Sequence, residues 1–89
     1  MQKVKVENMK SNNGNNVPNQ FIIITTDGRY FQSYKSIIAY CDNNGRVTLG
    51  KDWDYSVTTG KYRNQFLGET KKETQHKLDD GTYWFDSEL

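Results

Sequence analysis

Two β-rich runs joined by Asp27-Gly28 constrain the fold of this chain more than any other feature of its sequence. The first run covers residues 21–26 (FIIITT) and the second covers residues 29–34 (RYFQSY). Asp-Gly between two such runs indicates a two-residue hairpin turn, because both positions of that turn need positive φ. An antiparallel sheet is therefore predicted around this hairpin.

A second hairpin and an edge strand extend the predicted sheet. Residues 37–41 and 46–49 are β-rich, and residues 42–45 (DNNG) between them have turn composition. Residues 3–7 (KVKVE) alternate polar and apolar side chains, which is typical of a half-buried edge strand. The result is an antiparallel meander of four strands, or five with the N-terminal segment.

Alternation along these strands leaves apolar side chains on both faces of the predicted sheet. Along residues 21–24 the four apolar side chains point alternately to the two faces, and the same alternation separates Ile38 from Ala39. The helical part of the chain brings enough large apolar groups to cover one face. We expect the other face to be covered by the loops around Trp53 and Val57, or by a partner.

Helical signals begin after residue 56. Residues 56–60 (SVTTG) offer several N-cap hydroxyls, and Gly68 is a natural helix stop. Residues 70–73 (TKKE) form a capping box for a second helix, which should end near residues 79–81 (DDG). Residues 83–85 (YWF) are predicted to be a last strand.

These elements predict an α+β fold, an antiparallel β-meander of four to five strands with two short C-terminal helices on one face and a last strand. With 89 residues, the chain has room for one domain, residues 1–89. Residues 10–19 (KSNNGNNVPN) are dense in Asn and Gly, so we expect a flexible loop there.

Charge and hydropathy exclude several classes of protein. Twelve basic and eleven acidic residues give a formal net charge of +1, which does not favour a dedicated polyanion binder. The longest apolar run, residues 21–24, is far too short to span a membrane. Residues 1–5 lack the apolar stretch of a signal peptide. We expect a soluble intracellular protein with no membrane contact.

Groups that could perform catalysis are scarce. The single histidine, His76, lies in a strongly polar run, and the single cysteine, Cys41, ends a predicted strand and excludes an internal disulfide. Asp52 and Asp54 could share one face and hold a divalent cation, but a lone pair of this kind is a weak metal signal and turn chemistry is the simpler explanation. We therefore predict no enzyme activity, no catalytic residues, no metal site and no cofactor.

The densest candidate recognition tract covers residues 53–68. Its aromatic and hydroxyl side chains alternate, and cations lie near a predicted helix N-terminus, where an anion could bind. The alternative interpretation is structural, with Trp53, Tyr62, Phe66 and Leu67 in the core. The residues predicted to contact a partner are Trp53, Tyr55, Thr58, Lys61, Tyr62, Arg63 and Trp84.

Residues 31–39 (FQSYKSIIA) and the tract at residues 53–68 together resemble a family of short uncharacterised proteins of bacteriophages and mobile elements. Members share a tract of the form W-D-Y-S-x-T-T-x-K-Y-x-x-x-F-L after a sheet-like segment, and the resemblance covers residues 20–70. It implies a phage or mobile-element origin and a location in the cytoplasm of a bacterial host. It implies no activity.

Three functions follow as hypotheses. The first is a non-enzymatic, anti-CRISPR-like antagonist that binds and inhibits a host defence or nucleic-acid-processing complex by occlusion, anchored by Trp53, Tyr55 and Trp84. The second is a small nucleic-acid-binding protein whose basic and aromatic surface consists of Lys51, Lys61 and Arg63 with Trp53 and Tyr55. The third is a self-assembling structural phage protein in which the spare sheet face makes a homodimer.

Overall fold

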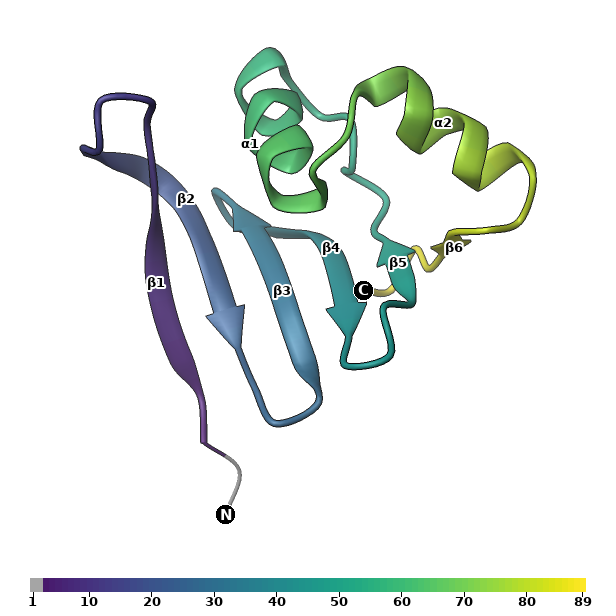
Figure 1. Ribbon diagram of the computed structural model, residues 1–89, viewed down its shortest axis with the longest axis horizontal. Coiled ribbons are helices and arrows are strands. Elements are labelled where there is room, and N and C mark those ends of the chain that lie inside the picture. Colours follow the sequence, from purple (N-terminus) through teal and green to yellow (C-terminus); the bar gives the residue numbers. More distant parts are fainter. Residues whose placement is uncertain (1–2) are drawn as a thin grey trace.

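The computed structural model describes residues 3–89 and folds them into one six-stranded sheet with two helices (Figure 1). The spatial order of the strands is their order in the chain, β1-β2-β3-β4-β5-β6. Neighbouring strands are antiparallel from β1 to β5, whereas β6 pairs with β5 in parallel. The elements are β1 (Lys5–Lys10), β2 (Asn16–Ile24), β3 (Gly28–Ser33), β4 (Ser36–Asp42), β5 (Val47–Leu49), α1 (Val57–Leu67), α2 (Lys71–Asp79) and β6 (Trp84–Phe85).

The predicted α+β class, with a mostly antiparallel sheet and two helices, is confirmed. The six strands exceed the four to five predicted for the meander, because the N-terminal strand and the last strand both join the same sheet. The predicted loop at residues 10–19 is too long, since Lys10 ends β1 and Asn16 begins β2. Asn-rich composition misleads here because cross-strand pairing, such as Lys10 with Asn16, overrides the local turn preference.

The turn between β2 and β3 lies one residue earlier than predicted, at Thr26 and Asp27. The backbone N–H of Thr25 donates to the carbonyl oxygen of Gly28 over 2.9 Å, and Ile24 is paired with Arg29. Among the described non-glycine residues, positive φ occurs at Asn19 and Tyr34, so Asp27 does not adopt it. Gly28 serves a different purpose, because a Cβ atom there would lie 2.3 Å from the Cys41 carbonyl oxygen.

A β-bulge in β4 changes which side chains reach the core. Phe31 pairs with Ala39 and Gln32 pairs with Ile37, which leaves Ile38 as the extra residue of β4. Ile38 and Ala39 are both fully buried in the same hydrophobic cluster. The prediction that strict alternation separates these two side chains is therefore wrong.

Both helices have the predicted caps. The Ser56 hydroxyl accepts a hydrogen bond from the Thr59 backbone N–H over 3.1 Å, and Gly68 ends α1 with a φ of 71°. Thr70 and Glu73 form both halves of the capping box that begins α2. These short-range signals are readable from sequence because each satisfies N–H groups that the first turn of a helix leaves free.

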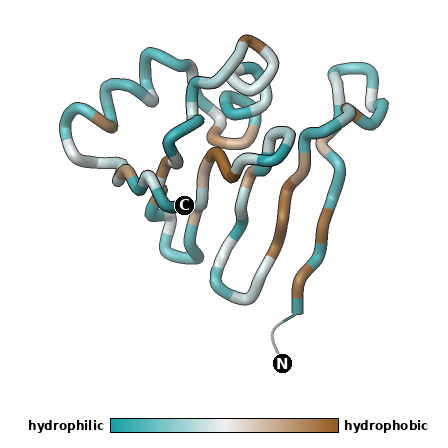
Figure 2. Tube along the Cα trace, turned by 180° about the vertical axis from the view of Figure 1, so that it is seen from behind, coloured by the Kyte–Doolittle hydropathy of each residue, from teal (hydrophilic) through white to brown (hydrophobic). Residues whose placement is uncertain are grey.

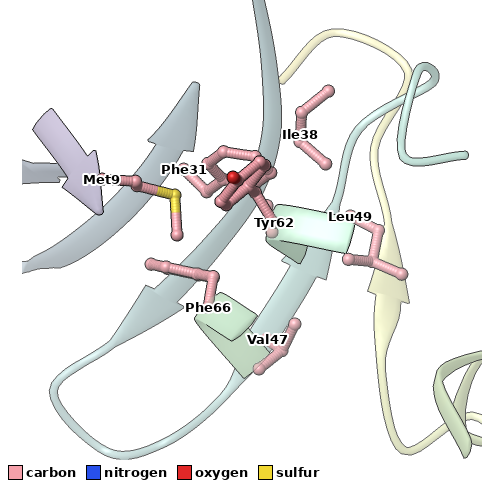
Figure 3. Packing of buried hydrophobic residues seen from close by; sticks show 8 residues of the cluster. Met9, Phe31, Ile38, Val47, Leu49, Tyr62 and Phe66 are labelled. Atoms are coloured by element: carbon pink, nitrogen blue, oxygen red, sulfur yellow. The ribbon is translucent and has the colours of Figure 1, made fainter. Parts of the chain in front are cut away.

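Helix α1 packs on one face of the sheet. The Phe66 ring of α1 stacks on Phe31 of β3 with the centroids 5.9 Å apart, and the hydroxyls of Ser33 and Thr59 are 2.9 Å apart. Figure 3 shows side chains from β1, β3, β4, β5 and α1 meeting in this core. The buried hydrophobic cluster is Met9, Phe31, Ile38, Ala39, Val47, Leu49, Tyr62 and Phe66, with Trp53, Leu78 and Tyr83 among the half-buried residues packed against it.

None of the helices within residues 3–89 is long and apolar enough to cross a membrane.

Candidate functional site

One row of directly paired residues crosses all six strands on the face opposite α1. Phe31 points toward α1, so its neighbour Tyr30 points to the other face of the sheet. The cross-strand partners of Tyr30 continue the row in both directions. We call this row the open face; it consists of Val6, Ile23, Tyr30, Tyr40, Thr48 and Trp84.

The open face is apolar and accessible. Val6 at one end is 60% exposed and Trp84 at the other is 53% exposed, while the four residues between them are half-buried by one another. Figure 2 shows hydrophobic stretches lying side by side along β1 and β2. Six strands spaced at about 4.8 Å give the row a width of about 24 Å. A sheet face of this width is large enough to contact another macromolecule.

Two tyrosines form the centre of the open face. The rings of Tyr30 and Tyr40 have centroids 4.5 Å apart and an angle of 31° between their planes. The Tyr40 hydroxyl donates to the backbone carbonyl of Asp27 over 3.1 Å, which fixes the ring. Burial, together with Tyr30 and Asp27, raises the pKa of Tyr40, so its hydroxyl stays neutral. The centre is thus a rigid aromatic pair.

A cation lies at the β6 end of the row. The guanidinium carbon of Arg46 is 4.5 Å from the centroid of the Trp84 ring, within the range of a cation–π contact. Arg46 and Thr48 are two residues apart in an extended segment, so they share the open face. The contact holds an otherwise exposed indole in one orientation, which reduces the entropy lost when a partner binds.

The predicted recognition tract is divided between the core and the surface. Arg63 is 1% exposed, and its Nη1 atom donates to the Trp53 carbonyl oxygen over 2.7 Å. The same nitrogen lies 3.3 Å from Oδ1 of Asp54, and Nη2 donates to Asn64 over 3.0 Å. Arg63 therefore ties the loop before α1 to the helix, and its guanidinium does not reach the surface.

Asp54 completes a charged group with α2. Its Oδ2 atom is 2.7 Å from Nζ of Lys71. The hydrogen bond from Lys71 lowers the pKa of Asp54, burial opposes this shift, and the hydrogen bond from Arg63 adds to it. Because the Arg63 charge is already matched by Asp54, the predicted anion site at the N-terminus of α1 lacks one of its two cations.

The remaining residues of the tract differ in accessibility. Tyr62 is buried in the core and Trp53 is half-buried against it, which agrees with the structural interpretation of both. Tyr55, Thr58 and Lys61 are exposed. Tyr55 and Thr58 line a cavity of about 660 Å³ beside the β3–β4 turn, whose lining residues are Ser33, Tyr34, Lys35, Ser36, Ile38, Asp52, Tyr55, Ser56 and Thr58.

Of the seven predicted partner-contact residues, Trp84 alone belongs to the open face, because α1 and the loop before it pack on the opposite side of the sheet. Sequence reasoning did not single out Val6, Ile23, Tyr30 or Tyr40. The available signal was the apolar alternation on both sheet faces. That signal shows that a second apolar face exists. It does not show how neighbouring strands align, and it is this register that brings the side chains into one row.

A second polar group, centred on Glu69, is structural. Oε1 of Glu69 accepts hydrogen bonds from Lys77 over 2.7 Å and from the Tyr83 hydroxyl over 2.8 Å, and Oε2 accepts one from Thr74 over 2.5 Å. Burial alone would raise the pKa of Glu69, but these three hydrogen bonds outweigh it and lower that pKa. Burial and the bond to Glu69 raise the pKa of Tyr83 to about 12. The group fastens α2 to the segment leading into β6.

Within residues 3–89, no three His, Cys, Asp or Glu side chains are grouped as a metal site would need. The fold and the open face define a small α+β protein with an accessible apolar sheet surface. The chain belongs to a family of unknown function, DUF8033, whose model matches residues 4–82. Comparisons with curated proteins and with solved structures returned no match.

Proposed function

We propose that this protein is a non-enzymatic binding protein and that the open face is the surface that contacts its partner. The observation that carries the proposal is the continuous row from Val6 to Trp84, which leaves aliphatic and aromatic side chains accessible across the whole sheet. Large accessible apolar patches on small proteins are typical of interaction sites. Aromatic side chains such as Tyr40 and Trp84 commonly supply most of the binding energy in such sites.

The chemistry of the open face favours a protein partner over a nucleic acid. The row itself carries no charge, and Arg46 beside Trp84 brings one cation to it. A nucleic-acid surface needs several cations to neutralise phosphates. Arg63 cannot serve, because it is buried, and Lys61 lies on α1, the helix packed against the other face. A basic and aromatic nucleic-acid surface around Trp53 is therefore the weaker alternative.

The resemblance to short phage and mobile-element proteins narrows the proposed partner to a protein of a bacterial host. In this proposal the protein acts in the host cytoplasm, and it inhibits a defence or nucleic-acid-processing complex by covering a surface that the complex needs. Occlusion requires a rigid, preformed contact surface and no catalytic group. The stacked Tyr30–Tyr40 pair and the Arg46–Trp84 contact supply that rigidity.

The test is affinity capture from bacterial lysate, with and without nuclease, using the wild-type protein and matched variants. We expect a stoichiometric host protein that survives nuclease and is lost with Trp84→Ala and with Tyr40→Ala. Tyr55→Ala is the control, since Tyr55 is 71% exposed but lines the cavity beside Ile38 and Thr58, on the α1 side of the sheet. Loss of the captured protein in Tyr55→Ala but not in Trp84→Ala would overturn the choice of surface. Capture that disappears with nuclease would favour the nucleic-acid alternative.

A further inference from the structure

Within residues 3–89, the outer strand β1 has an unpaired edge, because the sheet order places it at one end. Two side chains of this strand form an ion pair with each other: Nζ of Lys5 lies 3.5 Å from Oε1 of Glu7. Both remain accessible, with the side chain of Lys5 73% exposed and that of Glu7 49% exposed. An edge strand with free backbone groups is a template for pairing with another strand.

The hydrogen-bond alternation of the sheet shows which backbone groups of β1 are free. The Thr25 N–H donates toward β3, so the N–H and C=O groups of Ile24 and Ile22 point the other way, toward β1. Their partners in β1 are Lys5 and Glu7. The neighbouring residues Val4, Val6 and Asn8 therefore direct their backbone N–H and C=O groups away from the sheet.

We propose that β1 pairs with β1 of a second copy of this chain, antiparallel and with the two-fold axis at Val6. In this register Val6 lies opposite Val6 of the second copy, and each exchanges its outward backbone hydrogen bonds with the other. Lys5 then lies directly opposite Glu7 of the second copy, and Glu7 opposite Lys5. Two cross-strand ion pairs form in place of two contacts within single strands.

Charge and geometry select this register over its neighbours. Registers centred on Lys5 or Glu7 would use the same outward backbone groups, but they place Lys5 opposite Lys5 or Glu7 opposite Glu7, which is repulsive. A register centred on Val4 would place Lys3 opposite Lys5, which is repulsive. A register centred on Asn8 meets the irregularity between Asn8 and Lys10, where the pairing with β2 shifts. Of these registers, the one centred on Val6 places opposite charges face to face without also placing like charges opposite each other.

The pairing would also extend the open face. Val6 is the end of that row, so two copies joined at Val6 form one row from Trp84 of the first copy to Trp84 of the second. The pairing therefore doubles the length of the row. The dimer is inferred from the β1 edge alone and does not depend on the proposed function.

The decisive experiment is cysteine cross-linking at Val6, with Val4 as a matched control. Val4 and Val6 are 61% and 60% exposed and have the same backbone orientation, so a Cys at either is equally accessible. In a Cys41→Ser background, Val6→Cys should form an intermolecular disulfide on mild oxidation, because paired Cα atoms lie about 5.5 Å apart. Val4→Cys should not, since its copy would be about 14 Å away along the strand.

Sedimentation equilibrium on uncross-linked protein provides the second readout. The wild-type mass should rise toward the dimer with concentration. Val6→Pro should remain monomeric but folded, because proline is tolerated where the N–H of an edge strand points outward. Glu7→Lys should also be monomeric, and the double variant Lys5→Glu with Glu7→Lys should dimerise again. If Lys5 and Glu7 only stabilised the fold of a single copy, exchanging their charges would not restore the dimer.

Three outcomes would overturn the proposal: a wild-type monomer at every concentration, equal cross-linking at Val4 and Val6, or a dimer that survives Val6→Pro. None of them bears on the proposed function, which is tested through Tyr40 and Trp84. Loss of partner capture in those variants with dimerisation intact would separate the two surfaces. Loss of dimerisation with capture intact in Glu7→Lys, at a residue outside the open face, would do the same in the opposite direction.

Discussion

The guanidinium of Arg63 holds the loop residue Trp53 at two points. Nη1 of Arg63 donates to the Trp53 carbonyl oxygen over 2.7 Å, and the guanidinium carbon lies 5.1 Å from the centroid of the Trp53 ring. A planar, forked cation can make both contacts at once, whereas an ammonium cannot. This pair therefore accounts for the position of the loop that joins β5 to α1.

Replacing Arg63 should lower stability substantially. Arg63→Ala is expected to reduce the free energy of unfolding by about 3 kcal/mol, because it removes a buried charged hydrogen-bond donor and its packing. Arg63→Lys should lose about 2 kcal/mol, since it restores charge but not the forked geometry. Urea unfolding measures both. Exposed Lys61→Ala is the control and should change stability by less than about 0.5 kcal/mol; an equally small effect of Arg63→Ala would contradict the structural role.

Glu69→Gln should make stability less dependent on acid pH. The Glu69 pKa is lowered on folding, so the carboxylate contributes stability that is fully present above its unfolded pKa and is lost as pH falls through the folded value. At neutral pH the variant should lose about 1–3 kcal/mol, because three donors then face a neutral amide. Thermal unfolding of both proteins as a function of pH should show the difference narrowing under acid conditions; a constant difference would refute it.

The bulge in β4 predicts an asymmetry between adjacent isoleucines. Ile38→Ala should reduce the free energy of unfolding by about 2–5 kcal/mol, as expected for a fully buried aliphatic side chain. Ile37→Ala, at a half-buried position in the same strand, should have a clearly smaller effect. Chemical denaturation of the two variants provides the comparison. Equal effects would mean that Ile38 does not occupy the bulge position that buries it.

Gln20→Met should stabilise the protein. Gln20 is fully buried, and neither amide atom of its side chain has a hydrogen-bond partner among the described residues. A methionine of similar length removes two unsatisfied polar atoms and should raise the free energy of unfolding by about 1–3 kcal/mol. Gln32→Met is the control, since the Gln32 amide already donates to the Tyr34 carbonyl over 2.8 Å. A loss of stability in Gln20→Met would show that its amide is satisfied in solution.

Local chemistry explains what could be predicted of this fold. The helix caps at Ser56 and Thr70 lie within three residues of the N–H groups they satisfy, so sequence alone locates them. The bulge at Ile38 could not be predicted, because it depends on how β3 and β4 align. The same holds for Asn16, whose place in a strand is decided by its partner Lys10 and not by its own preference for turns.

The candidate site illustrates the same limit. An aromatic and basic tract around Arg63 is conspicuous in sequence, yet the fold buries its guanidinium by bringing it back to Trp53. The row that includes Tyr30 and Tyr40 is inconspicuous in sequence, because its members come from six separate segments. Only the register of the sheet gathers them, and register is set by the sum of many pairings.

The parallel pairing of β6 with β5 has a consequence for how the protein is made. Strands β1 to β5 follow one another through short connections, so they can assemble as soon as they leave the ribosome. The outer side of β5 must wait until both helices have been synthesised and Trp84 arrives. During that interval the nascent chain exposes the unpaired edge of β5 in addition to that of β1. How long β5 is open to pairing with other chains depends on how fast the ribosome synthesises the segment that contains β6.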